Sequence, residues 1–486
     1  MTAAEERELK KIERLLAQGA AKEALAALDA LRENGSAELL ARDAWRLDEQ
    51  YGAAWYALGD GQETAAAYWD AASHDRFLAA QLQHYSSYLF CLHYADLADE
   101  VVRQQHEAYG RMLAGVMPFD HEKRKRARLR IGYLSPSFRE HTVSQFCWPL
   151  FADRDRARYE VYGYELAGRE DAVTAQFRAL ADGWRVLDLH DYAAAAAQIA
   201  ADQLDILVDL GGHTEGGQTL MLLAYRPAPV QVCGIGWFDT TGLPAVDYIL
   251  TDGYCAPAAQ DGQFVERPLR LEHTHLCYTP APGLPELLPY AAGTGITFAS
   301  FHNYAKITDA MLTVWARILA AVPGSRLLLK DTTAYPERQT VMAQRLLRAG
   351  FAPGAVELQP GSEDYRAEYQ RSDILLDTYP YPGGGMTCEA LYMGVPVISR
   401  YGRRHGTRFG LSLLANLGLA ELAADSEAGY VAAAVALAQD RERLAGLHAS
   451  LRCRMQESPL MDHAAYMRDL ERGYEMIWDR WLKQPE

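Results

Sequence analysis

Residues 377–399 read DTYPYPGGGMTCEALYMGVPVIS and decide the fold class, because they combine a strand end, a glycine loop, a helix and a second strand. Gly383, Gly384 and Gly385 stand where the helix should begin. Glycine lets backbone N–H groups approach a ligand closely, and a helix N-terminus adds partial positive charge. The stretch therefore predicts a phosphate-binding loop, although it lacks the lysine of a P-loop and the first-strand position of a dinucleotide-binding motif.

Strands and helices alternate on both sides of a proline-rich stretch at 279–289. The first series begins at Leu129 with RLRIGYLS and continues through LDILVDLGG and VDYILTD. The second series begins with GITFASF and includes the glycine loop. Such alternation predicts parallel, doubly wound sheets, so we expect an α/β protein with two tandem Rossmann-like domains. A ligand should lie in the cleft between them, at the carboxyl ends of the strands.

The chain before Leu129 has helical spacing and almost no strand pattern. Residues 19–31 and 61–72 look alike and resemble the helices of a tetratricopeptide unit. We predict a short, degenerate helical array, and a plain helical bundle is the alternative. The predicted regions are a helical region at 1–120, one Rossmann-like domain at 121–285, and a second at 286–486 whose final helix crosses back.

Composition sets further limits on function. The net charge of −16 argues against general binding to nucleic acid or anionic membranes, so the basic run at 121–130 is interpreted as a solvated linker. The N-terminus lacks a signal-peptide pattern and no apolar run reaches 18 residues, so we expect no membrane insertion. The seven cysteines form no CxxC pair, which favours a reduced, cytoplasmic protein without a structural zinc.

Several motifs resemble, in order, the O-linked N-acetylglucosamine transferase/SPINDLY family. They are RIGYLSPSFREHTVSQF, DILVDLGGHTEGG, RPAPVQVCGIGW, TTGLPAVDYILTD, FHNYAKI and TCEALYMGVPV. The resemblance covers residues 78–482 and implies an inverting glycosyltransferase of the GT-B fold. In that fold, 121–285 would form the acceptor side and 286–486 would bind the nucleotide sugar.

Two histidines follow predicted strand ends of the first Rossmann-like domain, His141 in REHTVSQF and His213 in LGGHTEGG. By resemblance, His141 lines the sugar and acceptor site, where it could orient groups or act as a base. His213 is the second catalytic candidate, with a turn histidine as the alternative. Asp202, which precedes a strand, is more simply a surface residue than a base.

The second Rossmann-like domain supplies the residues expected to bind the nucleotide. Lys306 in FHNYAKITD matches the family's diphosphate-binding lysine, and its charge could stabilise the leaving group. Asn303 matches a family glutamine that contacts the nucleotide. Tyr365 aligns with a position that flanks the base, where an aromatic ring can stack, and a core aromatic is the alternative.

The glycine loop itself is expected to bind the diphosphate. The residues concerned are Gly383, Gly384, Gly385, Met386 and Thr387. Glu389, further into the helix, should accept hydrogen bonds from the ribose hydroxyls. The family usually carries a run of threonines here, whereas GGGM precedes a single Thr387, so backbone donors must suffice and the identity of the sugar stays open.

The segment 400–414, RYGRRHGTRFGLSLL, is basic within an acidic chain. Its members Arg403, Arg404, His405 and Arg408 could meet phosphate or acceptor. A solvated loop is the alternative.

We expect a transferase that moves a sugar from a nucleoside diphosphate to Ser or Thr of a protein. It should require no metal, because lysine and the helix N-terminus take that role and no DxD-type motif stands in the right place. UDP-N-acetylglucosamine is the expected donor, with GDP-fucose, or UDP-glucose and an asparagine acceptor, as alternatives. Flagellin or another surface protein is the suggested acceptor. The altered threonine run keeps open a catalytically degenerate scaffold protein.

Overall fold

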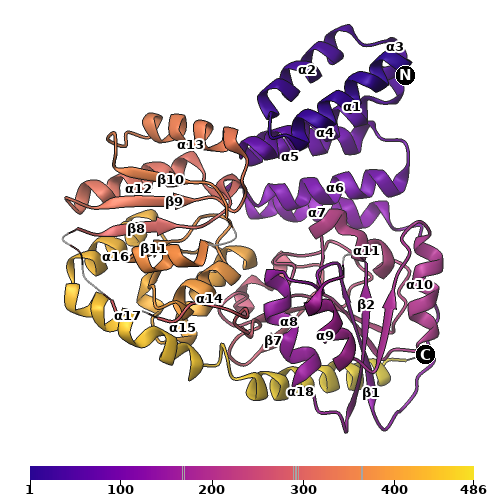
Figure 1. Ribbon diagram of the computed structural model, residues 1–486. Coiled ribbons are helices and arrows are strands. Elements are labelled where there is room, and N and C mark those ends of the chain that lie inside the picture. Colours follow the sequence, from indigo (N-terminus) through magenta and orange to yellow (C-terminus); the bar gives the residue numbers. More distant parts are fainter. Residues whose placement is uncertain are drawn as a thin grey trace. The chain divides into compact units, whose positions relative to one another are not determined.

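The computed structural model of the chain describes every residue except 167, 169, 288, 291, 292, 294, 363, 364 and 486. The described residues form two compact units, each built on one sheet (Figure 1). The N-sheet unit comprises Ala98–Pro282, Arg403–Gly406 and Met455–Glu486. The C-sheet unit comprises Met1–Leu97, Gly283–Gly402 and Thr407–Arg454.

The sheet of the N-sheet unit has seven strands in the order β3-β2-β1-β4-β5-β6-β7, and all neighbours are parallel. The order reverses between β1 and β4, so the carboxyl ends of these two strands form the switch point at which such sheets bind ligands. The strands are β1 (Leu129–Ser135), β2 (Tyr159–Glu165), β3 (Gly183–Val186), β4 (Ile206–Asp209), β5 (Val230–Cys233), β6 (Tyr248–Asp252) and β7 (Arg267–Leu271).

Helices connect and cover these strands. They are α7 (Asp99–Met112), α8 (Thr142–Ala152), α9 (Ala172–Leu180), α10 (Tyr192–Ala201), α11 (Gln218–Leu223) and α18 (His463–Leu482). The last of them, α18, packs against β5, β7 and α8, and its Tyr474 hydroxyl lies 3.3 Å from the hydroxyl of Tyr133 on β1. The C-terminal helix therefore completes the first sheet's core rather than the second.

The sheet of the C-sheet unit has six parallel strands in the order β10-β9-β8-β11-β12-β13. The strands are β8 (Thr297–Ser300), β9 (Arg326–Lys330), β10 (Val356–Gln359), β11 (Ile374–Leu376), β12 (Val397–Arg400) and β13 (Ala423–Ala424). The helices include α12 (Asp309–Ala321), α13 (Pro336–Arg348), α14 (Gly385–Tyr392), α15 (Phe409–Asn416), α16 (Glu427–Gln439) and α17 (Arg441–Gln456). The predicted α/β class with two Rossmann-like sheets is confirmed.

Seven helices precede β1. The first six are α1 (Ala3–Ala17), α2 (Ala21–Asn34), α3 (Ala37–Arg42), α4 (Ala44–Leu58), α5 (Gly61–His74) and α6 (Leu78–Leu92). Successive helices pack on one another, and Leu9, Leu28 and Leu47 share one apolar core. These helices belong to the C-sheet unit, whereas α7 belongs to the N-sheet unit. Among the described residues, no helix is both long and apolar enough to cross a membrane.

Buried contacts join the helical segment to the second sheet. Arg338 on α13 is fully buried, and its guanidinium donates to the carbonyls of Tyr56 and Ala57 at the end of α4. The same guanidinium pairs with the buried carboxylate of Asp331, which follows β9. The charges are satisfied only when helix and sheet are both present, so the helical segment is part of this unit's core.

Candidate functional site

The glycine loop is folded around one buried carboxylate. Asp377 follows β11, and its Oδ1 accepts hydrogen bonds from the backbone N–H groups of Gly383, at 2.8 Å, and of Thr378, at 2.9 Å. Its Oδ2 accepts from the Ser399 hydroxyl at 2.7 Å. Buried carboxylates with several donors hold their surroundings in one geometry, so Asp377 fixes the loop before any ligand is present.

A side chain has no room at Gly383. A Cβ built there would lie 2.7 Å from Thr387 Oγ1 and 2.8 Å from His302 Nε2. His302 is itself held by Asp377, whose Oδ1 lies 3.2 Å from the same Nε2. At Gly384 the nearest atom would be 3.8 Å away, so close approach requires a glycine at position 383 but not at position 384.

The start of α14 offers hydrogen-bond donors. Gly384 immediately precedes the helix, which begins at Gly385 and continues through Met386 and Thr387. The first backbone N–H groups of a helix have no intrahelical acceptor. In addition, the Thr387 hydroxyl is fully buried and has no hydrogen-bond partner among the described residues. A buried hydroxyl without a partner is costly, and an anion above the loop could accept its hydrogen bond.

Lys306 lies beside this loop. Its Nζ is 3.5 Å from the centroid of the Tyr381 ring, and the Tyr381 carbonyl accepts a hydrogen bond from Thr378 within the loop. Burial lowers the pKa of the Lys306 ammonium to about 8, and the nearby charge of Asp377 partly opposes that shift. A cation in a weakly hydrated place, held by a ring face rather than by a carboxylate, can pair with an incoming anion.

Glu389 is held on α14 by three side chains. The Tyr369 hydroxyl donates to its Oε1 at 3.0 Å, while the Tyr365 hydroxyl at 3.0 Å and Arg366 Nε at 3.2 Å contact its Oε2. The carboxylate is buried. The Tyr369 hydroxyl also lies 2.9 Å from Met386 Sδ, which links Glu389 to the loop residue Met386. The Tyr365 side chain therefore lies against Glu389.

Asn303 positions the turn that carries Lys306. Its Oδ1 accepts from the Ala305 N–H and from Arg338, each at 3.0 Å, and its Nδ2 donates to the Tyr56 hydroxyl at 2.8 Å. The amide is therefore engaged with protein groups from α4, α13 and its own turn. This geometry supports a role in holding Lys306.

His141 is the residue that precedes α8 in the N-sheet unit. Its ring is exposed, and Nδ1 accepts a hydrogen bond from the Val143 N–H at 3.2 Å. Partial loss of hydration and the charge of Arg139 lower the pKa of the imidazole, so the ring is neutral at pH 7. Because Nδ1 is the acceptor, the proton of the neutral ring resides on Nε2, and Nε2 can donate a hydrogen bond.

His213 follows β4 at the switch point but is buried. Its Nε2 donates to the Thr241 carbonyl at 2.9 Å, and its ring packs edge-on against Tyr109 and Trp237 at centroid distances of 4.7 and 5.0 Å. Burial holds the pKa of His213 well below its usual range. Asp202 pairs with Arg185 and accepts from the Tyr164 hydroxyl, away from these strand ends.

The basic segment is only partly a solvated loop. Arg403 is 79% exposed, but Arg404 is buried beside Asp99 and Asp239, with nitrogen–oxygen distances of 3.7 and 3.9 Å. His405 is also buried and donates from Nδ1 to the Phe238 carbonyl at 2.9 Å. The solvated-loop interpretation is therefore wrong for Arg404 and His405.

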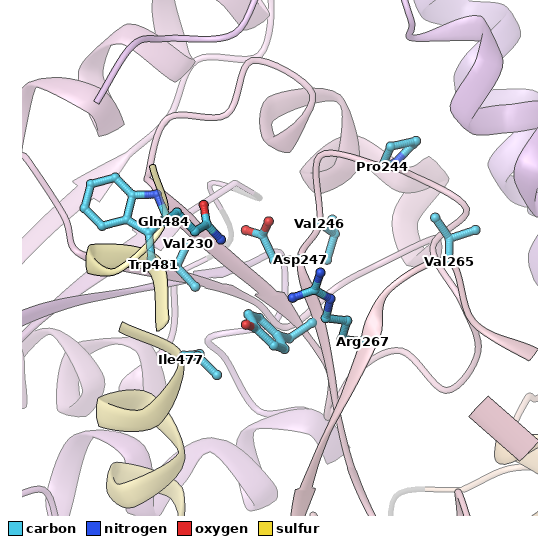
Figure 2. Close-up of a pocket in the computed structure, with 10 residues that line it drawn as sticks. Val230, Pro244, Val246, Asp247, Val265, Arg267, Ile477, Trp481 and Gln484 are labelled. Atoms are coloured by element: carbon cyan, nitrogen blue, oxygen red, sulfur yellow. The ribbon is translucent and has the colours of Figure 1, made fainter. Parts of the chain in front are cut away.

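A hollow of about 210 Å³ lies in the N-sheet unit, at the amino ends of the strands (Figure 2). Its lining includes Val230, Tyr248 and Arg267, the first residues of β5, β6 and β7, together with Trp481 of α18. Parallel sheets bind ligands at the carboxyl ends of their strands, whereas this hollow is at the amino ends. The hollow is therefore not a candidate for the site that binds the nucleotide sugar.

Two doubly wound parallel sheets, one of which carries a glycine loop that leads into a helix, define the GT-B class of glycosyltransferases. The sequence profile described as Glycosyl transferase family 41 matches residues 110–280 and 286–470. The chain belongs to this family, and the resemblance found in its motifs is confirmed.

Curated relatives extend the comparison. The chain is 39% identical over 401 residues to the probable UDP-N-acetylglucosamine–peptide N-acetylglucosaminyltransferase SPINDLY of Petunia hybrida, an overlap of 79% of this chain and 43% of that protein. It is 23% identical over 475 residues to the UDP-N-acetylglucosamine–peptide N-acetylglucosaminyltransferase of Caenorhabditis elegans, covering 73% of this chain and 41% of that protein. The chain thus spans less than half the length of these relatives.

A solved structure matches over nearly the whole chain. The O-GlcNAc transferase of Thermobaculum terrenum, in a mutant form, superimposes with a TM-score of 0.79 and 28% sequence identity. The match covers 99% of each chain. It includes the helical segment as well as both sheets.

Sequence reasoning missed three residues that shape the site: Asp377, His302 and Tyr381. Asp377 directly follows β11 and His302 lies two residues after β8, at the edge of a parallel sheet where polar residues gather. That signal was present in the sequence. The contact of Tyr381 with Lys306 joins residues 75 positions apart and had no sequence signal.

Proposed function

We propose that the protein transfers a sugar from a nucleoside diphosphate to a protein hydroxyl, with UDP-N-acetylglucosamine as donor and Ser or Thr as acceptor. One observation carries the proposal: the Lys306 ammonium lies beside a glycine loop in which the buried Thr387 hydroxyl has no partner among the described residues. The names of the relatives support the choice of donor and acceptor.

In the proposed complex, the diphosphate lies over the start of α14. Its oxygens accept hydrogen bonds from the first N–H groups of the helix and from Thr387 Oγ1, which has no other partner in the described chain. Lys306 moves from the face of Tyr381 to the phosphate. As the glycosidic bond breaks, negative charge grows on the diphosphate, and the ammonium stabilises that charge without a metal ion.

The nucleoside extends from the loop toward Glu389. A carboxylate has about four acceptor positions, and Tyr365, Arg366 and Tyr369 take three of them. The ribose hydroxyls therefore use the remaining position or displace the Tyr365 hydroxyl. Displacement would leave the Tyr365 ring beside the base, where it can stack.

His141 acts as a hydrogen-bond donor that orients the sugar or the acceptor. Its Nδ1 is engaged at the start of α8, so its Nε2–H is the group that reaches a substrate. A general base would need a lone pair on the atom that faces the acceptor hydroxyl. His213, buried against Thr241, supports the loop after β5 rather than touching the reacting atoms. Asn303 supports Lys306 in the same indirect way.

The acceptor is a protein that meets the enzyme in the cytoplasm, such as flagellin or another surface protein before export. The absence of the threonine run leaves GDP-fucose and UDP-glucose as rival donors, the latter with asparagine as acceptor. A scaffold protein without transfer activity is a further rival.

A donor panel tests the proposal. The protein is incubated with UDP-N-acetylglucosamine, UDP-glucose or GDP-fucose, with and without a chelator, and intact masses of candidate acceptors are recorded. UDP at 100 times its dissociation constant should raise the free energy of unfolding by about 2.7 kcal/mol. Stabilisation by GDP alone would reassign the donor. A lack of stabilisation by both nucleotides, together with no mass change, would favour the scaffold.

A further inference from the structure

A buried cluster of one cysteine and two histidines lies in the N-sheet unit. Cys255, His275 and His405 each offer one ligand atom, and these atoms lie within 4.8 Å of one another. All three residues are fully buried or nearly so. The sugar transfer proposed above uses none of the three, although the basic sequence of segment 400–414 made His405 a candidate for contact with phosphate or acceptor.

The three residues come from separate loops at the carboxyl edge of the sheet. Cys255 follows β6, and His275 follows β7. His405 comes from the short segment Arg403–Gly406, which packs with this unit. The rings of His275 and His405 have their centroids 5.2 Å apart. Residues up to 150 positions apart in the sequence are thus gathered at one point.

Both imidazole rings are oriented through Nδ1. His275 Nδ1 lies 2.6 Å from the Asp252 carboxylate, and His405 Nδ1 lies 2.9 Å from the Phe238 carbonyl. Asp252 also accepts the Cys255 N–H at 2.8 Å, so one carboxylate positions two members of the cluster. Histidines that bind metals usually donate their second ring nitrogen to a carboxylate or carbonyl, which directs the Nε2 lone pair to the metal.

We propose that Cys255, His275 and His405 bind one zinc ion through Sγ and the two Nε2 atoms, with water in the fourth position. Thiolate and imidazole are the ligands that zinc prefers, and three protein ligands with one open position make a recurrent zinc geometry. Tetrahedral zinc holds its ligand atoms about 3.3 to 3.6 Å apart, so the cluster needs to contract by about 1 Å.

Zinc binding changes the protonation of one group. The S–H bond of Cys255 breaks, a sulfur–zinc bond forms, and the proton passes to solvent buffer. No redox change occurs. The expectation of a protein without structural zinc rested on the missing CxxC pair, and a site assembled from three loops leaves no such spacing in the sequence.

The test uses the full chain, stripped of metal with a chelator and titrated with cobalt(II) as a spectroscopic probe for zinc. We expect saturation at one ion per chain, tetrahedral cobalt bands, and a thiolate-to-cobalt absorption band that zinc abolishes. Each ion bound should release a proton at neutral pH. These measurements on the unmodified chain need no variant.

Matched variants locate the ion. Cys255→Ser should abolish the thiolate band, and Asp252→Asn should weaken cobalt binding by about 10- to 100-fold, the usual effect of losing an orienting partner. Cys453→Ser and His273→Ala, which alter an exposed cysteine and an exposed histidine, should leave the titration unchanged. An unmodified chain that shows no thiolate band overturns the proposal. A band that survives Cys255→Ser but is lost in Cys453→Ser overturns it as well.

Discussion

The Lys306 ammonium rests on the face of Tyr381, with 3.5 Å between Nζ and the ring centroid. A cation held by a ring is held less firmly than one paired with a carboxylate, and the exchange for a phosphate is favourable. Lys306 therefore places a positive charge beside the glycine loop, where the proposed diphosphate would bind.

Removing that charge should slow transfer more than it weakens donor binding. Lys306→Ala should cut the single-turnover rate by about 10² to 10³, the scale for one preorganised group that stabilises developing charge. UDP affinity should fall less, because the negative charge grows between ground and transition states. Lys306→Arg should restore the rate only in part, since a planar guanidinium does not replace a compact ammonium. Transfer at the unmodified rate in Lys306→Ala would remove this residue from the site.

The lowered pKa of Lys306 predicts a pH dependence of UDP binding. Well below pH 8 the ammonium is charged in the free and the bound protein, so Lys306 should add no pH dependence to the affinity there. Above pH 8 the free protein loses this proton while bound diphosphate favours its retention, so the affinity should fall by up to about tenfold per pH unit. Calorimetric titration in buffers of different ionisation enthalpy would count the proton taken up. The same slope in Lys306→Met would assign the proton to another group.

Two neighbouring glycines should respond differently to alanine. In Gly383→Ala the new Cβ meets Thr387 Oγ1 and His302 Nε2 at under 3 Å, so the loop must shift. We expect a stability loss of about 1 to 3 kcal/mol and a loss of UDP binding of about 10²-fold. Gly384→Ala, where the nearest atom is 3.8 Å away, should keep the stability of the unmodified chain. Urea unfolding and UDP titration of both variants would separate the two cases. Equal stability of the two would contradict the close packing at Gly383.

Thr387→Val should separate stability from binding. The substitution removes a buried hydroxyl that has no partner among the described residues, so the free energy of unfolding should stay the same or rise by about 1 kcal/mol. UDP affinity should weaken by about 1.5 to 3 kcal/mol, the range for a hydrogen bond to a charged group. Unchanged UDP affinity in a stable variant would show that the hydroxyl does not meet the diphosphate.

Tyr365 offers a test of how the ribose reaches Glu389. Tyr365→Phe removes the hydroxyl that occupies the carboxylate and keeps the ring, so UDP affinity should be equal or higher. Tyr365→Ala also removes the ring and should cost about 1 to 3 kcal/mol if the base stacks there. Equilibrium binding of UDP and of uridine to both variants would measure the difference. Equal losses in the two variants would mean that the hydroxyl, and not the ring, is what the nucleotide uses.

Much of the fold followed from local patterns. Alternating strand and helix signals on either side of the proline-rich stretch predicted two parallel sheets, because βαβ units are encoded by consecutive residues. The glycine loop was likewise a local signal, since Gly383 to Thr387 lie within one turn of the helix start.

Local sequence patterns did not predict which side chains contact one another in the folded protein. The three partners of Glu389 come from one short segment near Tyr369, but their direction depends on how that segment packs. The cluster of Cys255, His275 and His405 depends on strand order, which brings the loops after β6 and β7 together with a distant segment. Arg404 and His405 are polar residues, for which the sequence predicts exposure, yet tertiary packing buries them.

The buried guanidinium of Arg338 bears on whether the helical segment can be removed from the C-sheet unit. Two of its acceptors are carbonyls at the end of α4, and the others are the side chains of Asp331, Asn303 and Thr333 in the C-sheet unit. The last turn of α4 therefore completes the hydrogen bonding of a buried cation beside the second sheet. A chain trimmed to its two sheets would take away the two α4 carbonyls and leave the ion pair with Asp331 in place. The lost hydrogen bonds to the charged guanidinium would cost about 1.5 to 3 kcal/mol each. The helices α1 to α6 therefore fold as part of the C-sheet unit and not as a separable attachment.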